Sequence, residues 1–358
     1  MRKRKWKPLW ALRNKAFAFF ERSSFFSRLW LFPLLYPIHW IWKSFAYLKK
    51  IRKRFSTPYQ STKTVVCIGN ALSGGTGKTP FLLKLLESLT EKKRKIAVIS
   101  RGYLSQLEKK EATVACYYEG PLFSPDVMGD EPFLICQKFP HILCVVGKDR
   151  LKAIKIAEKE ADIILLDDGL QDFRIKPTFT IGMQGFASWG DSHFFLPLGR
   201  LRDFPFAKNE VDLLVTSEKK AESANQISIE MVIKSYFNHY TNQPSLPKGP
   251  IAAFSAISQP QRFFETLQQN QCNVQGTFVF SDHEKISLDL LQKFWEKQKK
   301  RGAQALVCTE KDWVKISSFS GLPFPIISTF SQIKFISGEP KYQLLIEKIV
   351  SHGHNSKN

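Results

Sequence analysis

The feature that most constrains the fold is a glycine-rich loop between a short apolar run and a segment with helical periodicity. The run TVVCIGN (64–70) is rich in β-branched residues and predicts a buried strand. ALSGGTGKTP (71–80) follows, and then FLLKLLESLTEKKRK (81–95), whose apolar residues recur at helical spacing. Strand, glycine-rich loop, Lys-Thr pair and helix, in this order, are the parts of a P-loop.

This loop predicts a site for the phosphates of a nucleotide, with a plain glycine-rich turn as the alternative. Backbone N–H groups at the start of the helix would surround the phosphates. Lys78 would reach the β- and γ-phosphates, and the Thr79 hydroxyl would coordinate Mg²⁺. The loop is a variant form, because Leu72 stands where the usual pattern has its first glycine. The predicted phosphate-binding residues are Ser73, Gly74, Gly75, Thr76, Gly77, Lys78 and Thr79.

A pair of acids predicts the second part of the nucleotide site. In ADIILLDDGLQDFRI (161–175) an apolar run leads straight into Asp167 and Asp168, as at the end of a buried strand. One carboxylate could hold Mg²⁺ through water, and the other could orient the site or a substrate. Together with Thr79, these two aspartates form the predicted metal site. An acidic turn without metal is the alternative.

Further apolar runs alternate with helical segments and predict an α/β fold. The runs KIAVIS (95–100), HILCVVG (141–147), TFTIGM (178–183) and VDLLVTS (211–217) are short enough for buried strands. Strands alternating with helices indicate a P-loop NTPase-like core with a mostly parallel sheet and helices on both faces.

The chain beyond this core predicts a second, smaller α/β lobe. A polar connection and an irregular loop (238–250) precede IAAFSAIS (251–258), and further strand and helix patterns run to about residue 351. We therefore expect three parts: a basic aromatic segment over 1–63, the P-loop core over 64–237, and a lobe over 238–358 that closes the cleft.

The segment before the P-loop predicts attachment to an anionic surface. Residues 1–63 hold sixteen Lys or Arg and one acid, whereas the whole chain has 53 basic and 32 acidic side chains. Five of the eight tryptophans lie there too. The uncharged stretch 29–42 contains Pro33 and Pro37 and is shorter than the ~20 residues of a spanning helix. A helical segment lying on a membrane, with tryptophans at the headgroups, is the favoured interpretation; a nucleic-acid arm and a core helix with a basic flank are the alternatives.

The cysteines favour a reducing compartment. The chain has six, they are widely separated, and none forms a CxxC pair. Several lie inside apolar runs, where a thiol behaves as a small hydrophobic group. This spacing argues against a zinc site or a disulfide framework.

With these residues in view, the chain resembles the lipid A 4′-kinase (tetraacyldisaccharide 4′-kinase) family over most of its length. The resemblance rests on motifs that occur in the family's order: CIGNALSGGTGKTP (67–80), SRGY (100–103), GDEP (129–132), VGKDR (146–150), LLDDGLQ (165–171), LPLGRLRD (196–203), FSDH (280–283) and TEKD (309–312). It implies transfer of the ATP γ-phosphate to the 4′-hydroxyl of a tetraacylated glucosamine disaccharide 1-phosphate in lipid A biosynthesis.

The same resemblance implies where such an enzyme works and what it meets. Its place is the cytoplasmic face of the bacterial inner membrane, with peripheral or monotopic attachment. ATP and Mg²⁺ are the implied cofactors, and the acylated disaccharide lipid and the anionic membrane surface are the implied partners. No nucleic acid and no obligate protein partner is implied.

Catalytic and substrate-binding roles are carried over at matching positions. Asp130 and His283 resemble the family's catalytic pair, in which one group would accept the proton of the sugar hydroxyl; Lys78 completes the predicted catalytic set. Without the resemblance, His283 would be taken for a surface residue. The positions implied for the phosphate or the anionic substrate are Arg150, Gln171, Arg202 and Asp203.

Three positions depart from the family's usual pattern. Asp172 stands where a histidine is usual, which makes a phosphate contact there doubtful and metal or water binding more plausible. Asp203 replaces a glutamate, and Leu104 a frequent glycine. These departures bear on efficiency and on the acyl substrate, not on the type of reaction.

Two other classes of function remain open from sequence. A membrane-bound P-loop ATPase or GTPase switch would also have a variant GGTGKT loop and a basic anchor, but it needs no GDEP, LPLGRLRD or distal histidine. A nucleic-acid-binding NTPase would rest on the basic arm alone.

Overall fold

The computed structural model describes residues 32–184, 193–205, 210–217, 223–247, 249–281, 285–317, 319 and 321–355. Over these residues the chain has an α/β fold with a large, mostly parallel sheet, as the sequence predicts. Thirteen of the described strands form this sheet, and β1 (Tyr59–Gln60) and β7 (Ile175–Lys176) form a separate parallel pair.

The half of the sheet that carries the P-loop has the strand order β9-β8-β2-β6-β3-β5-β4. All of its pairs are parallel except β4–β5 at the edge. β2 and β6 are neighbours, so the P-loop and the paired aspartates follow adjacent strands at the same edge of the sheet. The strands are β2 (Thr64–Asn70), β3 (Ile96–Ser100), β4 (Thr113–Tyr117), β5 (Leu143–Val146), β6 (Ile163–Asp167), β8 (Phe179–Gln184) and β9 (Leu213–Thr216).

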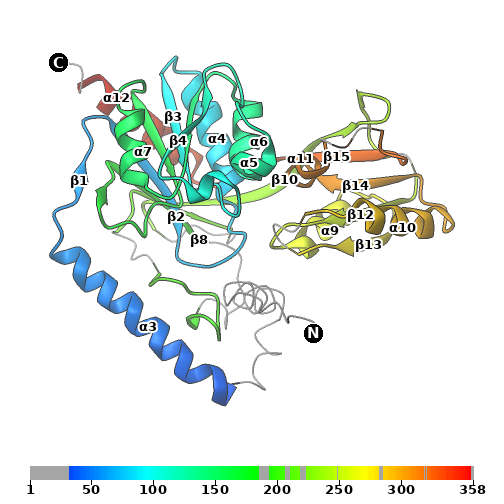
Figure 1. Cartoon of the computed structure of the whole chain (residues 1–358), viewed down its shortest axis with the longest axis horizontal. Coiled ribbons are helices and arrows are strands. Elements are labelled where there is room, and N and C mark those ends of the chain that lie inside the picture. The colour runs from blue at the N-terminus through cyan, green and yellow to red at the C-terminus, as the bar shows by residue number, and fades with distance from the viewer. Residues whose placement is uncertain are drawn as a thin grey trace, which may run out of the picture.

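Helices cover both faces of this half, which explains why its inner strands β2, β3, β5 and β6 are buried at every position (Figure 1). Successive residues of a strand point to opposite faces, so Val66 and Ile68 of β2 pack with α4 and α12, whereas Val65 and Cys67 pack with α7. The helices are α4 (Lys78–Thr90), the 3-10 turn η2 (Leu107–Lys109), α5 (Pro125–Met128), α6 (Asp130–Lys138), α7 (Arg150–Ala157) and α12 (Glu339–Asn355).

The other half of the sheet is a smaller α/β unit with its own apolar clusters. β12 pairs in parallel with both β13 and β14, and helices lie on its two faces. Its elements are β12 (Ile251–Ser255), α9 (Pro260–Gln269), β13 (Val274–Val279), α10 (Leu288–Lys299), β14 (Ala305–Thr309) and α11 (Glu310–Ile316).

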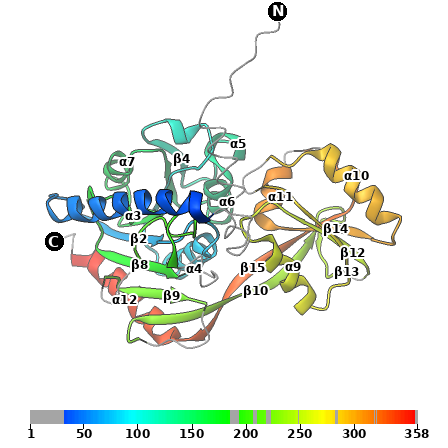
Figure 2. The ribbon, with the colours of Figure 1, turned by 90° about the horizontal axis from the view of Figure 1, so that it is seen from below.

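A long antiparallel ribbon of β10 (Gln226–Asn238) and β15 (Ile326–Ser337) joins the two halves (Figure 2). The short β11 (Gln243–Pro244) pairs with β10. The sequence predicts neither long strand, since it indicates only a polar connection before the irregular loop 238–250 and no ribbon after it. Most of β10 is exposed or half-buried, so it lacks the continuous apolar run of a buried strand.

Before the core, α3 (Phe32–Arg54) lies along the outside of the molecule (Figures 1 and 2). One stripe of the helix is buried, including Leu35, His39 and Ala46. The backbone N–H of Phe195 donates to His39 Nδ1 at 2.9 Å, which ties the helix to the 193–203 loop. Of the helices that the structure describes, none is long and apolar enough to span a bilayer.

The six cysteines are free, and five of them are buried. This agrees with the sequence-based expectation of thiols without a disulfide framework.

Candidate active site

The P-loop has backbone geometry that only glycine adopts readily. Gly77 precedes α4 with φ of 82° and Gly74 has φ of 90°, both in the left-handed region. A Cβ on Gly74 would collide with the guanidinium of Arg200, which therefore sits directly against the loop. Lys78 is the first residue of α4, which places its side chain at the positive end of the helix dipole.

Asn70 is the centre of the hydrogen-bond network that shapes the loop. It is fully buried at the end of β2. Its Nδ2 donates to Thr76 Oγ1 at 2.9 Å, and its Oδ1 accepts from Lys78 Nζ at 2.9 Å. Gln171 Nε2 donates to its backbone oxygen at 2.9 Å. Sequence reasoning missed Asn70; the available signal is a polar residue at the end of an otherwise apolar strand.

Asp168 lies among three cationic side chains. Its Oδ1 is 2.9 Å from Lys78 Nζ, and its Oδ2 accepts from Arg202 Nη1 at 2.9 Å. Arg202 Nη2 also pairs with this carboxylate, and Arg150 Nη2 donates to the Asp168 backbone oxygen at 2.8 Å. Burial alone would raise the pKa of Asp168, but Lys78 and Arg202 outweigh it and hold that pKa well below its usual range. The result is a positively charged cluster held together by one carboxylate.

Asp167 has a different environment although it is the next residue. Its side chain is buried, and Ser100 Oγ donates to its Oδ2 at 3.3 Å. Burial, followed by the nearby Glu131 carboxylate, raises the pKa of Asp167 to about 6. Within the described residues no cluster of three or more His, Cys, Asp or Glu could hold a metal ion. The oxygen donors of Thr79 and Asp167 fit Mg²⁺, which proteins commonly bind through one or two carboxylates plus nucleotide phosphates.

The loop 193–203 is hydrogen-bonded along the start of the P-loop, and this places Arg202. Ser73 N–H donates to Arg200 O at 2.7 Å, and Arg202 N–H donates to Ala71 O at 2.9 Å. Leu72 and Leu201 form an isolated antiparallel bridge. Asp203 lies 3.6 Å from Lys49 Nζ of α3, so this predicted substrate residue contacts the N-terminal helix.

Asp130 begins α6, beside the SRGY segment. A Cβ on Gly129 would lie 3.2 Å from the Cα of Gly102, so the GDEP and SRGY backbones are in close contact. The Asp130 carboxylate is 3.8 Å from Lys315 Nζ. Its predicted partner His283 lies outside the described residues, so the structure does not describe the Asp130/His283 pair.

Asp172, the departure from the family pattern, pairs with an arginine instead of facing the cluster. Arg174 Nη2 donates to its Oδ2 at 2.7 Å, and Arg174 Nε donates to its Oδ1 at 2.9 Å. Burial would raise the pKa of Asp172, but the hydrogen bonds from Arg174 reverse this and lower it. Its carboxylate is already matched by a positive charge.

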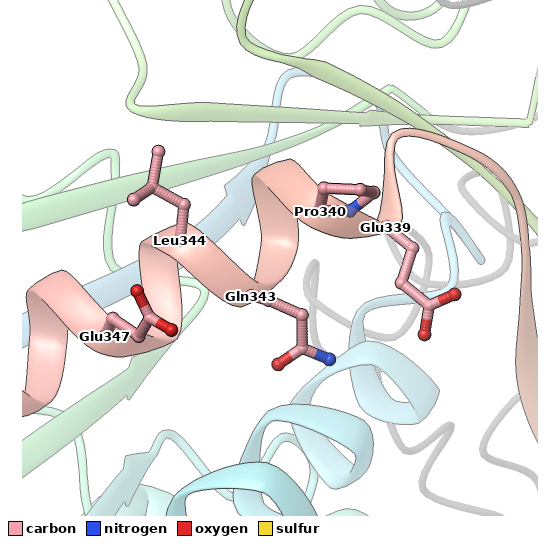
Figure 3. A pocket seen from close by; sticks show the side chains of 5 residues that line it. All are labelled: Glu339, Pro340, Gln343, Leu344 and Glu347. Carbon is pink, nitrogen blue, oxygen red and sulfur yellow. The ribbon is translucent and has the colours of Figure 1, made fainter.

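A hollow of about 650 Å³ lies elsewhere, along α12 (Figure 3). Its lining side chains include Gln343 and Leu344 and two glutamates, and none belongs to the predicted nucleotide site. Two carboxylates make it a poor place for phosphates. The cationic cluster around Asp168 is the better candidate.

Strand β2, the glycine-rich loop, Lys78 at the start of α4 and acids at the end of the neighbouring β6 define a P-loop phosphate-binding protein of the α/β class. The LpxK family model, described as "Tetraacyldisaccharide-1-P 4'-kinase", matches residues 31–350. The chain therefore belongs to the tetraacyldisaccharide-1-P 4'-kinase family, which confirms the resemblance seen in the motifs and assigns it to the kinases of lipid A biosynthesis.

Individual relatives agree with this assignment. A tetraacyldisaccharide 4'-kinase from Chlamydia pneumoniae is 35% identical over 298 residues, covering 78% of this chain and 80% of its own. One from Aliivibrio fischeri is 32% identical over 332 residues, covering 89% and 94%. The fold is similar to a crystal structure of LpxK from Aquifex aeolicus in complex with ATP, with TM-score 0.68, 21% identity, and coverage of 87% of this chain and 97% of that one.

Proposed function

We propose that the chain transfers the γ-phosphate of ATP to the 4′-hydroxyl of a tetraacylated glucosamine disaccharide 1-phosphate. The observation that carries this proposal is the cluster of Lys78, Arg202 and Arg150 around Asp168 at the end of the P-loop. Phosphoryl transfer depends mainly on positioning and on charge stabilisation, and this cluster supplies both. The ATP complex of the Aquifex aeolicus protein supports the choice of nucleotide.

In the proposed reaction the residues Ser73 to Thr79 hold the phosphates, and Lys78 contacts the transferred group. Asp130 orients His283, and one of the two accepts the proton of the sugar hydroxyl. The hydroxyl oxygen forms a bond to the γ-phosphorus as the bond from that phosphorus to the β–γ bridging oxygen breaks, and ADP leaves. Thr79, Asp167 and Asp168 would hold Mg²⁺, which neutralises charge on the phosphates when it is bound.

Arg150, Gln171, Arg202 and Asp203 are proposed to make up the substrate-binding part of the site, Arg202 by direct contact and the other three by holding the groups around it. Arg202 carries two donors into the cluster, a geometry that suits phosphate oxygens. Gln171 and Arg150 act by fixing Asn70 and the Asp168 backbone at the same place. Asp203 is proposed to act through the 193–203 loop, since its carboxylate faces Lys49.

We further propose that residues 1–63 attach to the cytoplasmic face of the inner membrane and that the second lobe closes over the P-loop core. The boundaries expected from sequence, 64–237 and 238–358, need one change, because α12 and the last part of β15 pack in the core cluster with α4. The closing lobe is therefore the unit from β12 to α11. The β10–β15 ribbon is the covalent and hydrogen-bonded link between the two lobes. Such a link allows two rigid units to change their angle without breaking either apolar core.

The assay that tests the function uses γ-labelled ATP and a tetraacyl disaccharide 1-phosphate in mixed micelles. Label moving to the lipid establishes donor, acceptor and reaction together. ATP hydrolysis with no labelled lipid would instead indicate a P-loop switch, or an acceptor of different chemistry.

His283→Ala is expected to lower kcat by ~10²–10⁴, because it breaks the pair that takes the proton of the sugar hydroxyl. The affinity for ATP should change little, since the proposed contact is to the acceptor. Single-turnover transfer and equilibrium nucleotide binding measure the two effects. Near-normal turnover would remove His283 from the catalytic pair.

The proposed membrane role of α3 predicts that substitutions on its exposed apolar face weaken membrane binding. Leu34, Ile41 and Phe45 are 68%, 56% and 67% exposed and share one face at helical spacing. Basic residues such as Lys43 and Lys50 lie on the same helix, as in an interfacial anchor. Replacing these three apolar residues by serine should weaken binding to anionic vesicles by about tenfold or more. Vesicle co-sedimentation measures the change.

Leu344→Ser is the matched control, because Leu344 is 52% exposed on α12, away from the anchor. Its vesicle binding should equal that of the wild type. Deleting residues 1–55 is a less specific test, since Trp42 Nε1 donates to Arg202 O at 3.3 Å and the deletion also disturbs the 193–203 loop. Unchanged vesicle binding by the triple serine variant would place the membrane contact elsewhere.

A further inference from the structure

A direct contact between α6 of the core and α11 of the second lobe is held by charged side chains. Lys311 Nζ lies 2.8 Å from Glu131 Oε1, and Lys138 Nζ lies 2.7 Å from Glu310 Oε2. The third link differs from these two because it is buried. The Lys315 side chain is only 5% exposed, and its ammonium is 3.8 Å from Asp130 Oδ2.

Within the second lobe, the Lys315 ammonium has two further contacts. It donates to the backbone oxygen of Ala256 at 2.8 Å and lies 3.8 Å from Asp312 Oδ1. A buried ammonium is costly unless carboxylates and hydrogen-bond acceptors surround it, and here they come from both lobes. Lys315 therefore joins the Asp130 carboxylate to the backbone of the second lobe.

Asp312 fixes the place from which Lys315 extends. It is fully buried, and it accepts hydrogen bonds from Ser255 Oγ at 2.9 Å, Ala256 N–H at 3.0 Å and Thr309 Oγ1 at 2.7 Å. Thr309 in turn caps α11, since its hydroxyl accepts from Asp312 N–H at 3.2 Å. The TEKD segment is thus a rigid support for the ammonium of Lys315.

The turn that follows β12 reaches the P-loop. A Cβ on Gly75 would lie 3.2 Å from Ser258 Oγ and 3.8 Å from Gln259 Cγ. Lys315 and Asp312 both bind Ala256 at the start of this turn. The Lys315 ammonium therefore hydrogen-bonds to the segment that contacts the phosphate loop, and the same ammonium also faces Asp130.

We propose that Lys315 is a positioning residue, whose ammonium orients the Asp130 carboxylate and links its orientation to the docking of the second lobe on the P-loop. This rests on the proposed function, in which Asp130 belongs to the catalytic pair. When the lobes are docked, the ammonium faces the carboxylate; when they separate, α11 carries it away. The active arrangement of Asp130 thereby depends on the docking of the second lobe.

The test is a double-mutant cycle between Lys315→Met and Asp130→Asn, measured as single-turnover transfer to the lipid. Methionine keeps the length and volume of the lysine stem without its charge. Lys315→Met alone should lower the rate about tenfold or more, with ATP affinity within about threefold of the wild type. In the Asp130→Asn background the same change should lower it less than twofold, because the carboxylate that it orients is absent.

Lys138→Met is the matched control, since it removes an ion pair between the same two helices without touching Asp130 or Glu131. It should change the rate less than threefold. If Lys315→Met does not fold, Lys315→Gln takes its place, because glutamine retains a donor for Ala256 O and lacks the charge. Equal rate losses in both backgrounds, or equal losses for the Lys138 and Lys315 variants, would overturn the proposal. Normal transfer by Asp130→Asn would overturn the proposed role of Asp130 as well, which distinguishes the two failures.

Discussion

Lys78→Ala is expected to reduce phosphoryl transfer to the lipid by about a thousandfold or more, equivalent to about 4 kcal/mol of transition-state stabilisation. Lys78 begins α4, and its ammonium contacts both Asn70 Oδ1 and Asp168 Oδ1 at 2.9 Å. It is thus held at the end of the phosphate loop before any nucleotide arrives. Alanine removes the charge from the position where negative charge gathers in the reaction.

Lys84→Ala is the matched control for this experiment. Lys84 lies on the same helix and pairs at 3.0 Å with Glu87 on the surface, where an ion pair contributes little. Its transfer rate should stay within about twofold of the wild type. The Lys78 variant should also keep its fold, because Arg202 still pairs with Asp168. Substantial lipid labelling by folded Lys78→Ala would show that the P-loop assignment is wrong.

Much of the core was predictable because its signals are local. The β2 strand, the glycine-rich loop and α4 follow one another without a gap, and each has its own pattern. The strands β3, β5, β8 and β9 are buried enough to be apolar runs. Buried parallel strands are thus found from sequence because both of their faces are covered.

The β10–β15 ribbon and the role of Asn70 at the centre of the site were not predictable in the same way. β10 and β15 are only partly buried, so their pattern is not that of a core strand. The role of Asn70 depends on Gln171 and Arg202, which are 101 and 132 positions away. Asp203, which the family resemblance assigns to the substrate, lies 3.6 Å from Lys49 Nζ because α3 packs against the 193–203 loop. Contacts of this range are set by topology, which a single sequence pattern does not encode.

Asp168→Asn is expected to separate nucleotide binding from phosphoryl transfer. Asparagine tolerates the left-handed backbone of this position, where φ is 54°, so the loop should keep its shape. Lys78 and Arg202 then lose the carboxylate that pairs with their positive charges. Binding of ATP without divalent metal should be equal or tighter, because the two cations no longer have a competing anion.

Transfer should nevertheless fall by about 10²–10³, since the two cations lose the carboxylate that positions them and the proposed Mg²⁺ site loses a ligand. Asp172→Asn is the matched control: it removes a carboxylate four residues further along, one that pairs with Arg174 at 2.7 Å instead of with the cluster. Its rate should stay within about threefold of the wild type. Calorimetric binding of ATP in the presence of a chelator, set beside the labelled-lipid assay with Mg²⁺, measures both quantities for each variant. A parallel loss of binding and transfer in Asp168→Asn would mean that Asp168 supports the fold of the loop, and a rate like that of Asp172→Asn would exclude it from the reaction.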